Sequence, residues 1–437
     1  MLFCENFGLS VGYESCTEVG VPLGEWSFGR GRCPFNAPSL FAPVPDFRKN
    51  TLVSIRNYMP PLARVSRLSK SSPIKKRREA RYVHVLVVDE SAAVRQIIST
   101  MLMSVRGITV EVAADLEFAS GKIRRKRPDV IVMGGSSMEH LAFLKKTMAE
   151  DPIPVVLCSS FTGCGPSDAI RALEQGAVEI IPRPRLDGVG NLEESRAIMV
   201  DAILGASSCR MRAVGPAPSE AAVQPVFGRL KALKSMAFPA TEDKILVMGA
   251  STGGVEALRV VLKDIRPDVP GIVVAQHMPQ EFTRALADSL AGITNIKVRE
   301  AANGDRVRSG CALVVPGNKH AVIKRLGARY FVEVMDGPLV NRRRPSLDVL
   351  FRSVAIAAGP NAVGVVLTGM AGDGANGLLE MKRAGAIVIA QDERSSLVFG
   401  LARQAISSGA VDVVAPLADI ASIIHSMASE QELAVAG

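Results

Sequence analysis

KILVMGASTGG, residues 244–254, fixes how the second half of the chain folds. Its apolar run predicts a buried strand that ends at a serine between glycines, and a helix then begins near Gly254. Such a turn places Ser251 at the carboxyl edge of a sheet, where the free N–H groups of the helix face any ligand. The spelling of residues 249–253 fits the turn of a serine nucleophile. From this segment alone, a phosphate-binding or packing loop is as well supported as a serine nucleophile.

The residues after this turn alternate apolar runs with helical stretches, which predicts an α/β domain over 244–428 with a doubly wound parallel sheet. Further strands are expected at 271–275, 312–315, 362–367 and 386–390, and helices at 281–290 and 346–358.

The residues from 83 to 204 show the same alternation and predict a flavodoxin-like α/β domain with five strands. These strands are expected at 83–88, 109–113, 130–133, 154–159 and 179–181. Residues 205–243 lose the strand pattern and are interpreted as a linker, with one helix near 229–235. Residues 429–437 are interpreted as a tail.

The net charge of +9 is concentrated near the start of the chain. Residues 48–81 hold eleven Lys or Arg and one Glu, a balance of +10, so the rest of the chain sums to −1. Residues 1–82 are interpreted as a disordered basic extension, because few aromatic residues interleave with the basic block at 48–81, and residues 1–47, rich in Gly, Pro and Phe, show no clear periodicity. Nucleic acid is therefore not expected as the main partner. A nucleic-acid role of this arm predicts binding that weakens steeply with salt.

Length and composition are typical of a two-domain cytoplasmic protein. At 437 residues the chain is too long for one ordinary core. It has no apolar run long enough to span a membrane and no secretory leader pattern. Its seven cysteines lack metal-type spacing, so free thiols in a reducing compartment are expected.

Three strand ends of the second domain carry residues suited to acyl chemistry. Ser251, His277 and Asp373 each follow a predicted strand, and loops at the carboxyl ends of parallel strands converge on one crevice. A serine needs an imidazole to take its proton, and the imidazole needs a carboxylate to hold its tautomer. The chain order differs from that of the α/β-hydrolases, which argues against an ordinary lipase.

Each of these residues also has a structural interpretation. Ser251 can cap a helix, Asp373 can cap a turn, and a single histidine is more often structural than catalytic. Three such coincidences together are a poor explanation. No spacing typical of a hydrolytic metal site occurs. His320 is expected to pack near the site. The three arginines at 342–344 could meet an acidic receptor surface, but a solvated loop is the preferred interpretation.

The second domain resembles the catalytic domain of the chemotaxis protein-glutamate methylesterase and glutamine deamidase family. The motifs that carry the resemblance are GASTGG (249–254), AQHMP (275–279), VPGNKH (315–320), RPSLDVLF (344–351), TGMAGDG (368–374) and QD (391–392). The resemblance implies Ser251 as nucleophile, His277 as general base and acid, and Asp373 as its partner. It also implies the Met370 N–H in the oxyanion hole and Thr252 beside the nucleophile.

The first domain resembles a response-regulator receiver, through VLVVDES (85–91) and IPRP (181–184). In that family an acidic pair binds magnesium, and Asp89 and Glu90 match the pair. Ser159 matches the hydroxyl residue after the fourth strand, and Arg183 stands where the family has lysine. Gly134 occupies the position of the phosphorylated aspartate.

The glycine predicts a pseudo-receiver that cannot form an aspartyl phosphate. Asp129 is no substitute, because it lies five residues earlier in the strand, roughly 16 Å away at about 3.3 Å per residue. Arg183 also presents a forked guanidinium in place of a point charge. In the family an unphosphorylated receiver covers the catalytic cleft. Permanent restraint, release by a partner and constitutive activity all remain open for this chain.

The resemblance implies hydrolysis of γ-glutamyl methyl esters on the cytoplasmic helices of methyl-accepting chemoreceptors, with methanol as product, and deamidation of selected glutamines. It implies no cofactor and no membrane insertion, and the receiver points to a chemotaxis histidine kinase as a second partner. Two other functions stay open. A scaffold that uses the pseudo-receiver for docking needs no intact triad, and a general ester hydrolase prefers short acyl esters to receptor helices.

Overall fold

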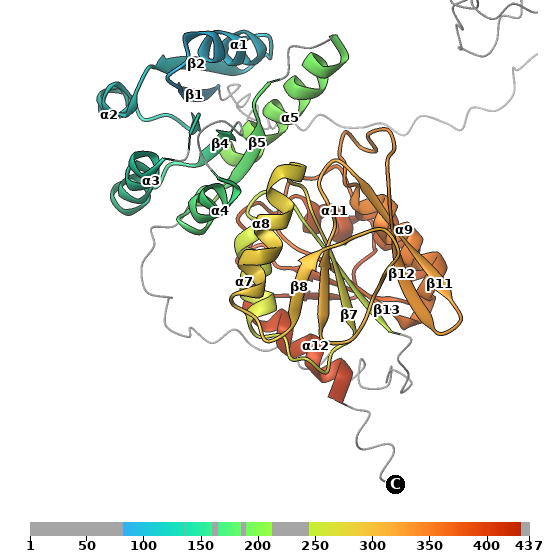
Figure 1. Ribbon diagram of the computed structural model, residues 1–437. Helices are drawn as coiled ribbons and strands as arrows, with labels where there is room; N and C mark the ends of the chain where they lie inside the picture. Colours follow the sequence, from blue (N-terminus) through green and yellow to red (C-terminus); the bar gives the residue numbers. More distant parts are fainter. Residues whose placement is uncertain (1–81, 136, 160–164, 185–188, 212–243, 430–437) are drawn as a thin grey trace, which may run out of the picture. The chain divides into compact units, whose positions relative to one another are not determined.

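The computed structural model describes residues 82–135, 137–159, 165–184, 189–211 and 244–429 (Figure 1). The predicted N-terminal extension, except Tyr82, lies outside these residues. So do the predicted helix at 229–235, most of the predicted linker, and residues 430–437 of the predicted tail.

The first sheet is parallel, with strand order β2-β1-β3-β4-β5, which is the flavodoxin-like order expected from the sequence. Its strands are β1 (Val83–Val88), β2 (Ile108–Ala113), β3 (Val130–Met133), β4 (Val155–Ser159) and β5 (Glu179–Pro182). Its helices are α1 (Ala92–Met103), α2 (Leu116–Arg125), α3 (Met138–Glu150), α4 (Pro166–Glu174) and α5 (Val189–Ser207). Helix α5 continues past residue 204, the predicted end of this domain.

Both faces of this sheet are covered, because successive strand residues point to opposite sides. Val85 and Val87 pack with α1 and α5, whereas Leu86 and Val88 pack in a core with α2, α3 and α4. The two layers leave the carboxyl ends of the strands free for a site, as in other doubly wound sheets.

The second sheet has seven parallel strands in the order β15-β14-β13-β6-β7-β10-β8. They are β6 (Ile245–Ala250), β7 (Gly271–Gln276), β8 (Lys297–Glu300), β10 (Cys311–Val314), β13 (Ala362–Val366), β14 (Ile387–Gln391) and β15 (Val413–Ala415). The predicted doubly wound parallel sheet is therefore correct, although β8 and β15 were not predicted.

Six α-helices of the described residues cover this sheet on both faces (Figure 1). Helices α7 (Gly254–Lys263), α8 (Gln280–Ala291) and α12 (Ile420–Ser429) share one apolar core with strand residues. Helices α9 (Leu347–Ala358), α10 (Ala375–Arg383) and α11 (Leu401–Ser407) share the core on the other face. The short 3₁₀ helices η1 (Gly359–Asn361) and η2 (Leu417–Asp419) lie between larger elements.

Strand β6 lies at the point where the strand order of the second sheet reverses. The chain continues from β6 to β7 on one side, whereas β13 pairs with β6 on the other. A crevice opens outside the carboxyl ends of strands at such a point. The three loops that follow β6, β7 and β13 therefore meet there.

A small antiparallel sheet, absent from the predictions, packs beside α9. It consists of β9 (Asp305–Arg306), β11 (His320–Leu326) and β12 (Arg329–Met335), in the order β11-β12-β9. Its buried residues, such as Tyr330 and Ile323, join the core that contains α9. The first residue of β11 is His320, so the hairpin brings this side chain toward the N-terminus of α9.

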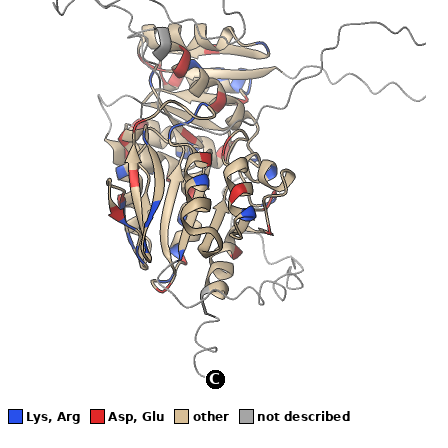
Figure 2. Cartoon of the chain, turned by 90° about the vertical axis from the view of Figure 1, so that its right-hand side faces the viewer, with Lys and Arg blue, Asp and Glu red and all other residues tan. Residues whose placement is uncertain are grey.

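Basic and acidic residues are interspersed over the elements drawn in Figure 2. No helix among the described residues is long and apolar enough to cross a bilayer. Cys158, Cys209 and Cys311, the cysteines that the structure describes, are free thiols.

Candidate active site

Ser251 is held in a tight turn directly after β6. Its N–H donates to the Thr368 carbonyl at 3.0 Å, and its carbonyl accepts from the side-chain amide of Gln276 at 2.8 Å. A Cβ at Gly369 would lie 2.5 Å from the Ser251 Cβ, so only glycine lets the loop after β13 approach the serine this closely. These contacts bury Ser251 and fix its position at the strand end.

His277 and Asp373 form a hydrogen-bonded pair beside this turn. The His277 Nε2 lies 3.0 Å from the Asp373 Oδ2, and both side chains are buried. The backbone N–H of His277 donates to the Ala250 carbonyl at 3.1 Å. This bond connects the loop after β7 to the end of β6. The structure thus brings the three strand-end residues of the sequence analysis to one crevice.

Five donors converge on the Asp373 carboxylate. Apart from His277 they are the Asn341 side chain at 2.9 Å, the Ser346 hydroxyl at 2.9 Å, the Leu347 N–H at 2.6 Å and the Asp348 N–H at 3.2 Å. The two N–H groups belong to the first turn of α9, where a helix stabilises negative charge. Burial alone would raise the pKa of Asp373, but these hydrogen bonds outweigh it and lower the pKa to about 2.

His320 supports this arrangement from behind. Its Nδ1 accepts from the Ser346 N–H at 3.2 Å, and its Nε2 donates to the Pro338 carbonyl, 2.9 Å away. Ser346 in turn caps α9 and donates to Asp373. The expectation that His320 packs near the site agrees with this position, and its effect on the carboxylate passes through Ser346.

The Nδ1 of His277 is the ring nitrogen that remains available for proton transfer. Because Nε2 donates to an anionic carboxylate, the neutral ring carries its proton on Nε2. Among the described residues, Nδ1 and the Ser251 Oγ are both buried without a hydrogen-bond partner. Burial lowers the pKa of His277, against the opposing effect of Asp373, so the ring is neutral near pH 7.

Two backbone N–H groups flank the serine without an acceptor among the residues that the structure describes. They belong to Thr252, next to Ser251 in the chain, and to Met370, in the loop after β13. Such N–H groups can stabilise an oxyanion at low energetic cost, because they are fixed before the reaction. The donor predicted at Met370 and the neighbour predicted at Thr252 therefore lie at the same crevice.

In the first domain, the side chain of Asp89 occupies the space beside Gly134. A Cβ at Gly134 would lie only 1.8 Å from the Asp89 Oδ2. The same oxygen is 2.8 Å from Arg183 Nη2, and the other oxygen accepts from the Ser91 N–H at 2.8 Å. Asp89 is 2% exposed, so Arg183 neutralises a carboxylate that is almost fully buried.

Glu90, the second predicted acid, is not brought into this pair. Glu90 is exposed, and Ser159 is the last residue of β4. Asp129 accepts from the His84 N–H at 2.8 Å before the start of β3, whereas Gly134 follows its end. Within the described ranges there is no group of three or more His, Cys, Asp or Glu side chains that could hold a metal.

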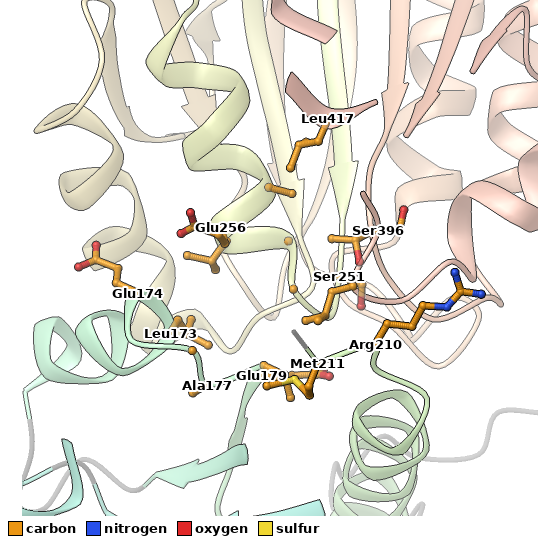
Figure 3. A pocket seen from close by; sticks show the side chains of 18 of the residues that line it. Leu173, Glu174, Ala177, Glu179, Arg210, Met211, Ser251, Glu256, Ser396 and Leu417 are labelled. Carbon is orange, nitrogen blue, oxygen red and sulfur yellow. The ribbon is translucent and has the colours of Figure 1, made fainter. Parts of the chain in front are cut away.

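The crevice around Ser251 is lined by residues of both sheets' domains (Figure 3). The cavity measures about 760 Å³, and Glu179 of β5 lies on its wall with Ser251. The Glu179 carboxylate accepts from the Thr252 hydroxyl at 2.7 Å, and the Gly253 N–H donates to the Val178 carbonyl at 3.0 Å. Burial raises the pKa of Glu179.

The expectation of a solvated loop at 342–344 is wrong for two of its three arginines. Arg343 pairs with Asp201 of α5 at 3.5 Å, and Arg344 approaches Glu194 of the same helix at 4.0 Å. These contacts could not be predicted from sequence, because nothing in the local pattern of α5 or of the arginine loop says what faces it.

Comparisons with known proteins add an independent result. The model of the CheB methylesterase family matches residues 246–424. The protein-glutamate methylesterase/protein-glutamine glutaminase 3 of Geobacter metallireducens is 49% identical over 344 residues, which are 78% of this chain and 97% of that protein. A relative of the same name, numbered 2, from Chromobacterium violaceum is 46% identical over 353 residues, 78% of this chain and 99% of that one.

Two solved structures from Thermotoga maritima are also similar. The CheB methylesterase catalytic domain is 34% identical, with a TM-score of 0.41, and covers 42% of this chain and 98% of that one. The response regulator domain of CheB is 30% identical, with a TM-score of 0.26, and covers 29% of this chain and 97% of that one.

Proposed function

Because this chain belongs to the family of CheB protein-glutamate methylesterases/protein-glutamine glutaminases, we propose that it hydrolyses glutamate γ-methyl esters on the cytoplasmic helices of chemoreceptors. Deamidation of receptor glutamines is part of the same proposal, and both reactions would adapt chemotaxis signalling in the cytoplasm. The observation that carries it is the buried His277–Asp373 hydrogen bond beside Ser251, with one ring nitrogen left over for the serine proton.

In the proposed reaction, the Ser251 Oγ attacks the γ-carbonyl carbon of the ester while the His277 Nδ1 takes the hydroxyl proton. The carbonyl π electrons move to oxygen, where the N–H groups of Met370 and Thr252 stabilise the negative charge. Collapse of this intermediate breaks the bond to the methoxy oxygen. That oxygen leaves as methanol with the proton from His277, and an acyl-serine remains.

Water then attacks the acyl-serine, and His277 takes one of its protons. Collapse of the second intermediate releases the γ-carboxylate of glutamate and returns the proton to Ser251. With glutamine as substrate, ammonia leaves in place of methanol. Throughout, Asp373 stays ionised and stabilises the imidazolium, which its low pKa permits.

We expect the activity to persist into mildly acidic solution. The reaction requires neutral His277, and burial lowers the pKa of this residue below the ordinary value of about 6.5. The value of kcat/KM should therefore rise with pH through a midpoint below 6.5 and be level at neutral pH. The rate of methanol release between pH 4.5 and 8 measures this.

Glu179 is the matched control for the pH profile, because it lies at the same crevice and burial raises its pKa. Glu179→Gln does not titrate and keeps an oxygen for the Thr252 hydroxyl. A midpoint that stays in place in this variant assigns the acidic limb to His277. A midpoint above 6.5 in both proteins contradicts the proposed role of a desolvated histidine.

The test of the proposed function is methanol release from methylated cytoplasmic fragments of a chemoreceptor by the full chain. Turnover supports the methylesterase. Absence of turnover by a folded protein that still binds the fragments favours a docking or scaffolding protein. Faster hydrolysis of short acyl esters than of receptor fragments favours a general ester hydrolase.

We further propose that the first domain is a receiver without an acceptor. Gly134 supplies no oxygen, and the Asp89 carboxylate fills the adjacent space in an ion pair with Arg183. A histidine kinase that docks on this domain would then act by binding and not by phosphoryl transfer.

Incubation of the chain with acetyl phosphate and Mg²⁺ is expected to give no acid-labile phosphate, because neither Gly134 nor the paired Asp89 offers a free carboxylate. Radiolabel retained after denaturation at neutral pH is the measurement. Stoichiometric labelling contradicts the prediction, and Asp89→Asn and Asp129→Asn then show which carboxylate accepted the phosphoryl group.

A further inference from the structure

One face of α5 is turned toward the crevice of Ser251. Glu194, Asp201 and Gly205 are spaced by seven and four residues, which places them within about 40° on one side of an α-helix. The structure shows each of them in contact with the catalytic domain. The contacts of α5 with that domain therefore run along one line of the helix.

The two acids on this line pair with adjacent arginines. The Asp201 Oδ2 lies 3.5 Å from Arg343 Nη2, and the Glu194 Oε1 lies 4.0 Å from Arg344 Nη2. Only 13% of the Arg343 side chain is exposed. A charge desolvated to this degree needs an acidic partner, because burial of an unpaired guanidinium is costly.

The glycine on the line touches the residues proposed to hold the reacting group. A Cβ at Gly205 would meet the Met370 Cγ at 2.8 Å and the Thr252 Oγ1 at 3.2 Å. A larger side chain at this position would collide with the Met370 side chain unless Met370 shifted. Glycine at 205 therefore lets α5 lie directly against the side chains of Met370 and Thr252.

Other contacts hold the same domain over the crevice. Glu174 pairs with Arg259 at 2.6 Å, and Glu179 accepts from Thr252 at 2.7 Å. Arg210, after α5, pairs with Glu393 at 2.7 Å, so in this pair the base follows α5 and the acid belongs to the catalytic domain. Along α5 itself, however, the pairs have acids on the helix and arginines on the catalytic domain.

We propose that α5 occupies the path of the substrate helix, and that Arg343 and Arg344 bind acidic side chains of that helix when α5 is displaced. The inference rests on the proposed function, whose substrate is a glutamate-bearing receptor helix. A site that must accept such a helix needs cations beside its crevice, and α5 presents the matching acids at helical spacing. Gly205 then stands at the position of the reacting glutamate.

The geometry defines a register for the substrate. Counted from the methylated glutamate, the residue four positions earlier corresponds to Asp201 and faces Arg343. The residue eleven positions earlier corresponds to Glu194 and faces Arg344. Substrate helices with acids at these positions should be preferred over helices with lysines there.

The experiment compares two substrates of the full chain, a methylated receptor fragment with acids in this register and a small neutral methyl ester. The measured quantity is the ratio of kcat/KM for the fragment to kcat/KM for the small ester. This ratio cancels any change in how often α5 leaves the crevice, because both substrates need the open site. Arg343→Gln and Arg344→Gln should each lower it about 10-fold, in the range of a charge-assisted hydrogen bond.

The matched controls separate substrate recognition from release of α5. Arg342→Gln changes an exposed neighbouring arginine that forms no ion pair within the described residues, and it should leave the ratio unchanged. Asp201→Asn removes the partner of Arg343 on α5. It should raise kcat/KM for both substrates and leave their ratio unchanged.

A charge exchange tests the register directly. Arg343→Glu should hydrolyse a fragment with lysine four residues before the methylated glutamate faster than the acidic fragment. An unchanged ratio in Arg343→Gln and Arg344→Gln, with both esters hydrolysed, overturns the inference and leaves the proposed function standing. Absence of hydrolysis of both esters by the unmodified chain overturns the proposed function and the inference with it.

Discussion

Substitution of Ser251 by alanine is expected to lower kcat for methanol release by about 10,000-fold or more. The variant retains the crevice, the His277–Asp373 pair and the flanking N–H groups, but it has no oxygen to attack the ester. Steady-state methanol release from a methylated receptor fragment measures the loss. Binding of the fragment should persist, because the serine hydroxyl forms no hydrogen bond among the described residues.

Ser408→Ala provides the matched control, since this serine is exposed at the end of α11 and its hydroxyl donates only to the Ala405 carbonyl. It should keep the activity of the unmodified chain. Both variants should unfold at nearly the same temperature. Residual turnover by Ser251→Ala within 10-fold of the unmodified chain would show that another group performs the attack.

The substitution Asp373→Asn is expected to lower kcat about 10,000-fold, as loss of the orienting carboxylate does in other serine triads. The amide nitrogen of asparagine is a donor, and all five groups around this carboxylate are donors as well. The variant therefore also loses about 1–3 kcal/mol of stability through unsatisfied polar groups. Methanol release and thermal unfolding, measured on the same samples, report the two effects.

Asp348→Asn separates catalysis from stability. Asp348 is a buried carboxylate of the same network that accepts from Asn341 at 2.8 Å and from the Gly377 N–H at 2.7 Å, and it does not contact His277. It should lose similar stability and only a few-fold in kcat. Equal losses of kcat in the two variants would mean that Asp373 acts through the fold alone.

The buried parallel strands could be predicted from sequence because their apolar runs are continuous. The expected strands at 83–88 and 130–133 coincide with β1 and β3. The β11 and β12 hairpin was missed because it shows neither a continuous apolar run nor a regular alternation: β11 is buried at its start and exposed over its last three residues. Strand β15 has three residues and is too short for any periodicity.

The residues at the strand ends could be predicted because chain order and strand position suffice to bring them together. Ser251, His277 and Asp373 needed only the expectation that parallel strands end at one edge. The hydrogen bonds from Asn341 and Ser346 to Asp373 could not be predicted from sequence. They depend on how the start of α9 packs against the loop that follows β13. The motif RPSLDVLF marked this segment without giving its purpose.

The carboxylate of Asp89, which fills the space beside Gly134, bears on how long the protein can retain a signal. A phosphorylated receiver stays activated for the lifetime of the acyl phosphate, even after the kinase has left. A receiver without an acceptor stores nothing, and its open fraction follows at once the concentrations of whatever competes for the covered face. The rate of adaptation through such an enzyme would be set by mass action and would depend on the concentration of receptor helices.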